Sequence, residues 1–207
     1  EALNRKKSES GGDLVVCAEA VFEQMDLDRD PLPRGPFDVV AARDVLHRLR
    51  GVERFGAQVE RVLDRSGMFI AREYVGPNRL QFPEEQMALV NALLALLPER
   101  LRQAPDMDEP MERQFAPDLA EVMRFDPTFA VCAEDVEKMV YLHFRVLEEI
   151  PLGGTLLAPL LANIGGCFAA GDAEAGRVLA ALLDAEMRLI AGGLIRCDYK
   201  AYIARPG

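Results

Sequence analysis

The sequence predicts an α/β fold with a mainly parallel sheet, and three observations point to it. Short apolar runs typical of buried strands recur at residues 14–18, 37–42 and 68–71. Residues 52–64 lie between the last two runs and place apolar side chains at helical spacing. Residues 28–36 are rich in proline and predict a loop. The order strand, loop, strand, helix, strand is typical of a parallel α/β sheet.

The pattern of predicted strands and helices changes after residue 77. Residues 83–102 predict a strong helix, with a proline at its start and acidic residues in its first turn. The leucines of this segment cover more than one helical face, so both sides of the helix are expected to be buried. Shorter helices are predicted at residues 118–124 and 134–142.

The last third of the chain returns to a mixed pattern. Residues 144–147 alternate polar and apolar side chains like a strand, and residues 156–168 and 173–191 predict apolar helices. Residues 199–204 predict a final strand, antiparallel and at or near an edge of the sheet.

Composition excludes several classes of partner. A net charge of −10 argues against a nucleic-acid backbone or an anionic membrane surface as the main partner, because both reward basic proteins. No run of about 18 apolar residues free of charges is present, so no membrane span is expected. The four cysteines form no C-x-x-C pair and only two histidines are present, so no metal site is expected. Free thiols favour a reducing, cytoplasmic location.

Polar residues follow each predicted strand, where ligands of open α/β sheets bind. Glu19 follows the first strand, where a carboxylate could accept hydrogen bonds from a ligand, although the residues alone favour a solvated loop glutamate. Arg43 and His47 follow the second strand. A histidine there could act as a general base or as part of a pocket wall, or it could simply fill the start of a short helix.

The third strand is followed by a richer polar cluster. Glu73 and Tyr74 bring a carboxylate and a phenol to the strand exit, and Arg79 lies close behind them. This cluster is the best substrate-side candidate in the chain. The structural alternative is a loop tethered by hydrogen bonds.

Several motifs resemble class I S-adenosylmethionine-dependent methyltransferases, in particular a group of bacterial small-molecule methyltransferase-like proteins. Residues 37–40 (FDVV) and 44–47 (DVLH) resemble the family's fourth strand and the segment that follows it. Residues 61–69 (RVLDRSGMF) are similar to the entry into its fifth strand. Residues 73–77 (EYVGP) and 97–100 (LPER) resemble a more specific signature of the bacterial group.

The resemblance implies a sheet of strand order 3-2-1-4-5-7-6, with the last strand antiparallel and a helical insert between the fifth and sixth strands. The chain would then divide into a partial cofactor-binding Rossmann-like part (1–76), a helical insert or cap (77–143), and the C-terminal part of the same sheet (144–207). The implied cofactor is S-adenosylmethionine, and the implied partner is a small-molecule methyl acceptor. The implied cofactor contacts are Glu19, Ala42, Arg43 and Leu46, and the residues implied to face the acceptor are Glu73, Tyr74 and Arg79.

The sequence departs from the family at its N-terminal side. No two glycines stand in the G-x-G spacing that would let backbone approach the cofactor. Residues 1–10 resemble the helix after the family's second strand, so the sheet is expected to lack its first two strands. Their removal would leave a gap of roughly 14 Å, or three inter-strand spacings. An N-terminal segment, direct pairing of the third and fourth strands, or another chain would have to close it.

Three functions follow from this reading. The first is methyl transfer from S-adenosylmethionine to a small molecule, with His47 or Glu73 orienting or deprotonating the acceptor. The second is a non-catalytic, decayed methyltransferase that binds a partner or forms a homo-oligomer through its leucine-rich helices. The third, a binding protein for another nucleotide, has only the α/β pattern behind it.

Overall fold

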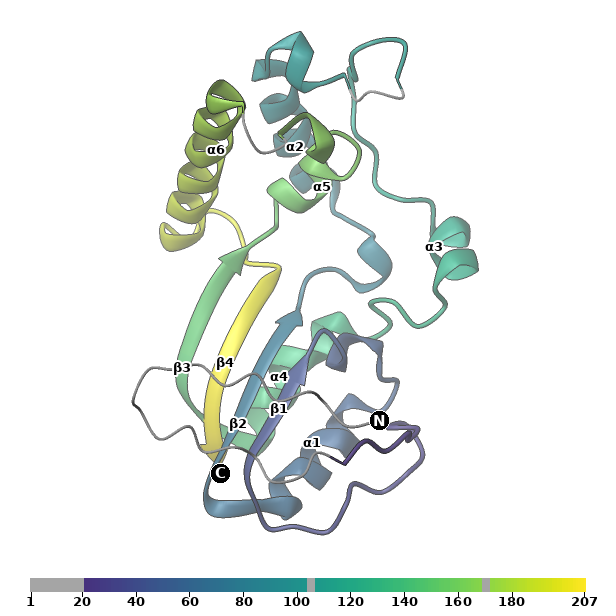
Figure 1. Ribbon diagram of the computed structural model, residues 1–207, viewed down its shortest axis with the longest axis vertical. Helices are drawn as coiled ribbons and strands as arrows, with labels where there is room; N and C mark the ends of the chain where they lie inside the picture. Colours follow the sequence, from purple (N-terminus) through teal and green to yellow (C-terminus); the bar gives the residue numbers. More distant parts are fainter. Residues whose placement is uncertain (1–20, 104–106, 169–171) are drawn as a thin grey trace, which may run out of the picture.

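The computed structural model describes residues 21–103, 107–168 and 172–207 (Figure 1). Its sheet consists of β1 (Phe37–Arg43), β2 (Leu63–Tyr74), β3 (Phe144–Gly153) and β4 (Tyr199–Pro206). The predicted strand at residues 14–18 and the candidate Glu19 lie outside the described residues.

The strands are arranged in the order β1-β2-β4-β3. β1 pairs with β2 in parallel, whereas β4 is antiparallel to both of its neighbours. If β1 is the expected fourth strand, the observed strand order corresponds to the 4-5-7-6 part of the predicted order. The last strand of the chain is antiparallel, as predicted. The α/β fold class is therefore confirmed, and β4 lies one strand in from the edge.

Two helices cover one face of the sheet, α1 (Val52–Val62) and α4 (Ala133–His143) (Figure 1). They share one hydrophobic core with the sheet, which includes Val59, Phe69 and Val140. Gly56 allows the two helices to approach closely, because a Cβ there would lie 2.6 Å from Met139 Sδ. The opposite face of the sheet leaves apolar side chains such as Val39 and Ile70 exposed to solvent in the described part of the chain.

A second layer of helices lies beyond the carboxyl end of β2 (Figure 1). α2 (Glu84–Leu96), α5 (Leu157–Leu161) and α6 (Ala173–Ala191) pack around a separate apolar core. α3 (Leu119–Phe125) lies to one side of them. No helix within the described ranges is both long enough and apolar enough to cross a bilayer.

Helix ends agree with sequence signals in some places and not in others. α6 has the predicted bounds, because Asp172 accepts hydrogen bonds from the backbone of Glu174 (2.9 Å) and Ala175 (3.0 Å) and so caps its start. α2 ends earlier than predicted, since the residue before Pro98 is disfavoured in a helix. The short 3₁₀ helix Glu99–Leu101 follows it.

Two expectations about the helical layer are wrong. The single helix predicted at residues 156–168 is broken into α5 and the 3₁₀ helix Gly165–Phe168. α2 is not buried on both sides, because Leu96 is 80% exposed whereas Leu94 is fully buried. The predicted division of the chain into three parts, at residues 76 and 143, remains a prediction. α4 lies within the predicted insert, but it packs against the face of the sheet and shares its hydrophobic core.

Candidate functional site

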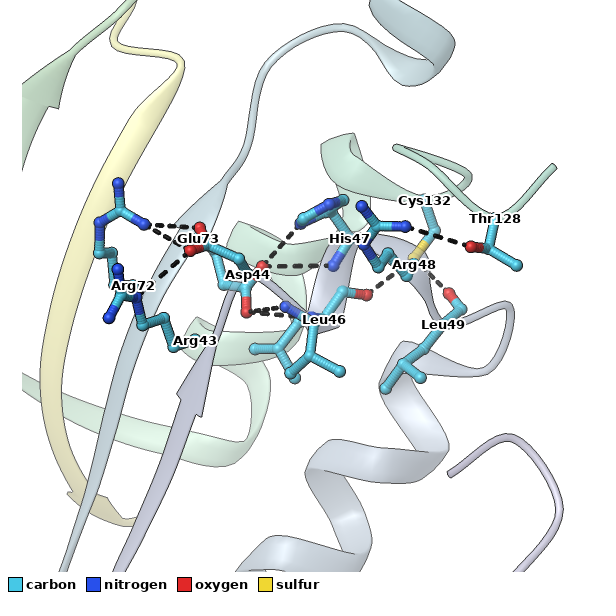
Figure 2. Close-up of polar contacts among 11 residues, drawn as sticks. Arg43, Asp44, Leu46, His47, Arg48, Leu49, Arg72, Glu73, Thr128 and Cys132 are labelled. Carbon is cyan, nitrogen blue, oxygen red and sulfur yellow. Dashed lines mark hydrogen bonds and ion pairs between the residues drawn. The ribbon is translucent and has the colours of Figure 1, made fainter. Parts of the chain in front are cut away.

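The candidate residues on two strands meet at one edge of the sheet. β1 and β2 are parallel and Arg43 pairs with Arg72, so the carboxyl ends of both strands lie side by side. Ala42 and Arg43 end β1, and Glu73 and Tyr74 end β2. His47 follows in the 3₁₀ helix η1 (Leu46–Arg48). The fold therefore brings these candidates together, as Figure 2 shows for most of them.

Glu73 is fully buried at this edge and is held by several donors (Figure 2). Its Oε1 accepts hydrogen bonds from the backbone N–H of Val45 (2.9 Å) and of Leu46 (3.0 Å). Its Oε2 lies 2.9 Å from His47 Nδ1. A carboxylate at the start of a helical turn satisfies N–H groups that have no partner within the turn. Glu73 thus fastens η1 to the end of β2.

His47 is buried against aromatic side chains, with 2% of its surface exposed. An ionised carboxylate only accepts hydrogen bonds, so with Glu73 ionised the donor in this contact is the His47 Nδ1–H. Nε2 is buried and has no hydrogen-bond partner among the residues that the structure describes. The ring lies edge-on to Phe129 at 5.2 Å and to Tyr74 at 6.1 Å between centroids. His47 therefore stands behind Phe129 rather than at the surface.

The arginines at the strand ends point to the open side of the sheet. Arg72 Nη1 contacts both carboxylate oxygens of Asp44, at 2.7 and 2.5 Å, and Arg43 Nε lies 3.4 Å from the same group (Figure 2). Asp44 has a φ of 54°, which turns the chain sharply after β1. The Arg43 side chain is 79% exposed, whereas Leu46 is fully buried and Ala42 nearly so.

Arg48 ties η1 to the segment before α4. Its guanidinium forms an ion pair with Asp126 and lies 4.8 Å above the Phe129 ring. Hydrogen bonds from Thr128 and Arg48 lower the pKa of Asp126. The arginine thus fixes Phe129 in place over His47.

The substrate-side candidates Tyr74 and Arg79 are engaged in holding the loop. Tyr74 Oη donates to the Pro77 carbonyl at 3.0 Å, and burial raises the pKa of its phenol. Arg79 donates to the carbonyls of Pro127 (2.7 Å) and Phe129 (3.2 Å). Both residues therefore fit the structural alternative for this cluster, which was a loop tethered by hydrogen bonds.

A cavity of about 620 Å³ opens just beyond these residues. Its aromatic lining comes from four separate parts of the chain: Phe82, Phe115, Phe129 and Tyr199. Sequence reasoning missed all four, since no local motif joins them. Polar groups at the cavity are Arg113, Gln114, Asp118, Glu121 and Asn163.

Cys132 lies next to η1 and is expected to be chemically inert. Its thiol is buried beside the Leu46 and Leu49 carbonyls, and burial raises its pKa to about 12. Almost no thiolate exists at pH 8, so iodoacetamide should leave Cys132 unmodified in the folded protein while labelling the more exposed Cys167. Peptide mass spectrometry measures both sites in one sample. Equal labelling of the two cysteines would contradict this placement.

Structural comparison finds solved structures with low similarity to this chain. A methyltransferase from Mesorhizobium loti, described as S-adenosylmethionine dependent, is 15% identical with a TM-score of 0.40; the match covers 88% of this chain and 68% of that one. Phosphoethanolamine N-methyltransferase 2 from Haemonchus contortus is 14% identical with a TM-score of 0.38, covering 84% and 34%. The cyclase SpnF is 14% identical with a TM-score of 0.40, and this chain spans 55% of its length.

The sequence comparisons give one match. No curated protein matches the sequence. Residues 1–71 match a family model described as a methyltransferase domain, and that segment includes β1, η1, α1 and most of β2. The N-terminal third of the chain is thus similar to a methyltransferase domain.

Proposed function

We propose that this protein transfers a methyl group from S-adenosylmethionine to a small molecule bound in the 620 Å³ cavity. The observation that carries the proposal is the methyltransferase-domain match over residues 1–71, which includes the strand end at Arg43. The cavity is lined by residues between β2 and α4, by α5 with the two residues that follow Leu161, and by Tyr199 at the start of β4. Ligands of open α/β sheets bind outside the carboxyl ends of the strands, which is where both features lie.

The cavity is suited to an acceptor with an apolar body and a few polar groups. Ligand sites are commonly apolar clefts of about 300–1,000 Å³ with a small number of polar groups that fix orientation. Phe82, Phe129 and Tyr199 offer ring surfaces, and Asn163 and Asp118 offer hydrogen-bonding groups. The acceptor would be a small organic molecule rather than a polymer.

The described residues would form one wall of the cofactor site. The backbone turn at Asp44 and the exposed side chain of Arg43 leave the end of β1 open to a ligand. Ala42 and Leu46 have buried side chains, and the Leu46 N–H and carbonyl are bonded to Glu73 and Leu49, so these two residues would shape the site from beneath. Glu19 is included among the proposed cofactor contacts on the basis of the sequence alone, since it lies outside the described residues. When bound, S-adenosylmethionine supplies a methyl group on a positively charged sulfur.

Glu73 and His47 would act as positioning residues in this site. A general base must reach the proton that it removes, directly or through one water. Glu73 is fully buried and already accepts two backbone N–H groups, and His47 Nε2 lies behind Phe129. Their contribution is to fix η1 and Phe129, and alignment of acceptor and methyl group accounts for much of such catalysis. Tyr74 and Arg79 would likewise shape the acceptor side by holding the loop that borders it.

Calorimetric titration of the full-length protein with S-adenosylmethionine tests the proposal. Saturable binding well below millimolar concentration is expected, followed by methyl transfer when acceptors of the stated kind are supplied. Absence of binding up to millimolar cofactor would remove the enzymatic function.

Shortening Phe82 to alanine should weaken acceptor binding. The ring lines the cavity and belongs to neither hydrophobic core, so its loss should lower kcat/KM for the acceptor by about 10-fold or more, equivalent to ~1.4 kcal/mol. The KM for S-adenosylmethionine should not change. Steady-state kinetics of Phe82→Ala and of the control Phe125→Ala, whose ring is 80% exposed on α3, measure both values. An equal effect of the two variants would place the acceptor elsewhere.

A non-catalytic binding module remains the second candidate, and α3 favours it. This short helix exposes Leu119 (43%), Met123 (50%) and Phe125 (80%), and α2 exposes Leu96 (80%). Clustered exposed apolar residues mark interaction surfaces. Light scattering of the full-length protein separates the candidates, since a module that dimerises through these helices would not be monomeric.

A further inference from the structure

A second cavity, of about 330 Å³, lies apart from the proposed acceptor site. It is bordered by the Gly76–Pro77 turn, the start of α2, and the segment 194–198 that leads into β4. The two cavities share no lining residue, although residues next to each other in the sequence can face different cavities. Asp198 lines the small cavity and Tyr199 the large one. The volume of the small cavity lies within the range of ordinary small-molecule sites.

Asp198 lines this cavity and is almost completely buried, with 3% of its surface exposed. Gln86 Nε2 donates to its Oδ2 at 3.2 Å and to the Thr155 carbonyl at 2.6 Å. A carboxylate offers about four acceptor positions, and Gln86 and Thr155 occupy part of them. Burial raises the pKa of Asp198, and the hydrogen bonds from Gln86 and Thr155 and the charge of Arg196 offset that effect only in part. The carboxylate is thus costly to keep ionised with the partners it has.

The surroundings of Asp198 favour a cation. Glu85 and Glu134 also line the cavity, so its three carboxylates outnumber the single basic residue, Arg196, within the described lining. Such a cavity has a negative potential that attracts positive ligands. The remaining walls are mainly apolar and include Leu89, Leu156 and Ile195.

We propose that this cavity binds a small organic amine, with its ammonium group against the Asp198 carboxylate and its apolar body against Leu89, Leu156 and Ile195. An ammonium is a hydrogen-bond donor, and the remaining acceptor positions of Asp198 can receive its N–H groups. The apolar walls favour an organic cation over a hydrated metal ion, because they can contact an apolar body but not the water shell of such an ion. This site does not depend on the proposed methyl transfer and requires no cofactor.

Calorimetric titration with three matched probes tests the inference. Phenethylamine, 2-phenylethanol and phenylacetate share an aromatic body and differ in charge. Phenethylamine is expected to bind the full-length protein at least about 10-fold more tightly than the alcohol, with no binding of the acid. Asp198→Asn should abolish the advantage of the amine, since the amide keeps the shape but not the charge. Asp118→Asn, which alters the rim of the larger cavity, is the matched control and should bind as the unchanged protein does.

Three results would overturn the proposal. The amine could bind no better than the alcohol, Asp198→Asn could retain the preference, or Asp118→Asn could remove it. Asp198→Asn should fold, because it removes a buried charge whose ionisation is unfavourable. A second variant, Leu89→Lys, changes a half-exposed residue of α2 and brings a competing positive charge to the cavity wall. It should also weaken amine binding about 10-fold or more, and unchanged binding in it would contradict the assignment.

Discussion

Replacing Glu73 with alanine is expected to lower the free energy of unfolding by about 3–5 kcal/mol. The substitution leaves the backbone N–H groups of Val45 and Leu46 and the ring Nδ1–H of His47 buried without their acceptor. Each unsatisfied buried donor costs about 1–3 kcal/mol. Urea denaturation followed by circular dichroism measures the loss. Glu73→Gln, which keeps one acceptor oxygen, should lose less.

The control for this prediction is a second glutamate–histidine pair in the same molecule. Glu60 Oε2 lies 3.0 Å from His143 Nδ1, but the Glu60 side chain is 41% exposed. Water can replace the lost contact there, so Glu60→Ala should cost no more than about 1 kcal/mol. Similar losses for Glu60→Ala and Glu73→Ala would show that Glu73 does not fasten η1 as described.

The second large effect is expected from Phe69→Ala in β2. The Phe69 ring is fully buried and stacks on Phe144 of β3 at 4.5 Å between centroids. Removing such a ring costs the transfer free energy of the lost atoms and leaves a cavity, about 3–5 kcal/mol together. The measurement is the urea midpoint of the variant at unchanged m-value.

Phe125→Ala is the matched control, because its ring is 80% exposed and should contribute within about 0.5 kcal/mol. A loss below about 1 kcal/mol for Phe69→Ala would be inconsistent with the core that joins the sheet to α1 and α4.

Three strands could be predicted from sequence because each contains a short, mainly apolar run. The segments predicted at 37–42, 68–71 and 199–204 all lie within observed strands. The start of β2 at Leu63 was missed, because residues 64–66 are polar and interrupt the apolar pattern, although Leu63 already pairs with Phe37. The order of the strands came from the family resemblance, and the topology of the described part agrees with it.

Burial was harder to predict than secondary structure. α2 has leucines on several faces, but which of them are covered depends on α5 and α6, which follow about 60 residues or more along the chain. The periodicity of the α2 sequence alone does not show which of its faces α5 and α6 cover. Leu96 is therefore exposed although it is as apolar as the buried Leu94.

The sequence predicted that the polar candidate residues gather at the strand ends, but it could not predict how each of them is held. A carboxylate and a histidine at strand ends suit acid–base catalysis and helix capping equally well. The burial of Glu73 and His47, visible only in the fold, favours positioning. The cavity residues Phe82, Phe129 and Tyr199 come from distant segments, so no pattern within one window could have joined them.

Hydrogen exchange of the full-length protein with and without S-adenosylmethionine tests most directly whether the end of β1 is the cofactor site. Exchange should slow in peptides that cover residues 41–48, and amides at residues 194–198 beside the small cavity should exchange as before. Saturation with cofactor that leaves residues 41–48 unchanged, or that protects only residues 194–198, would contradict a methyltransferase site at this edge of the sheet.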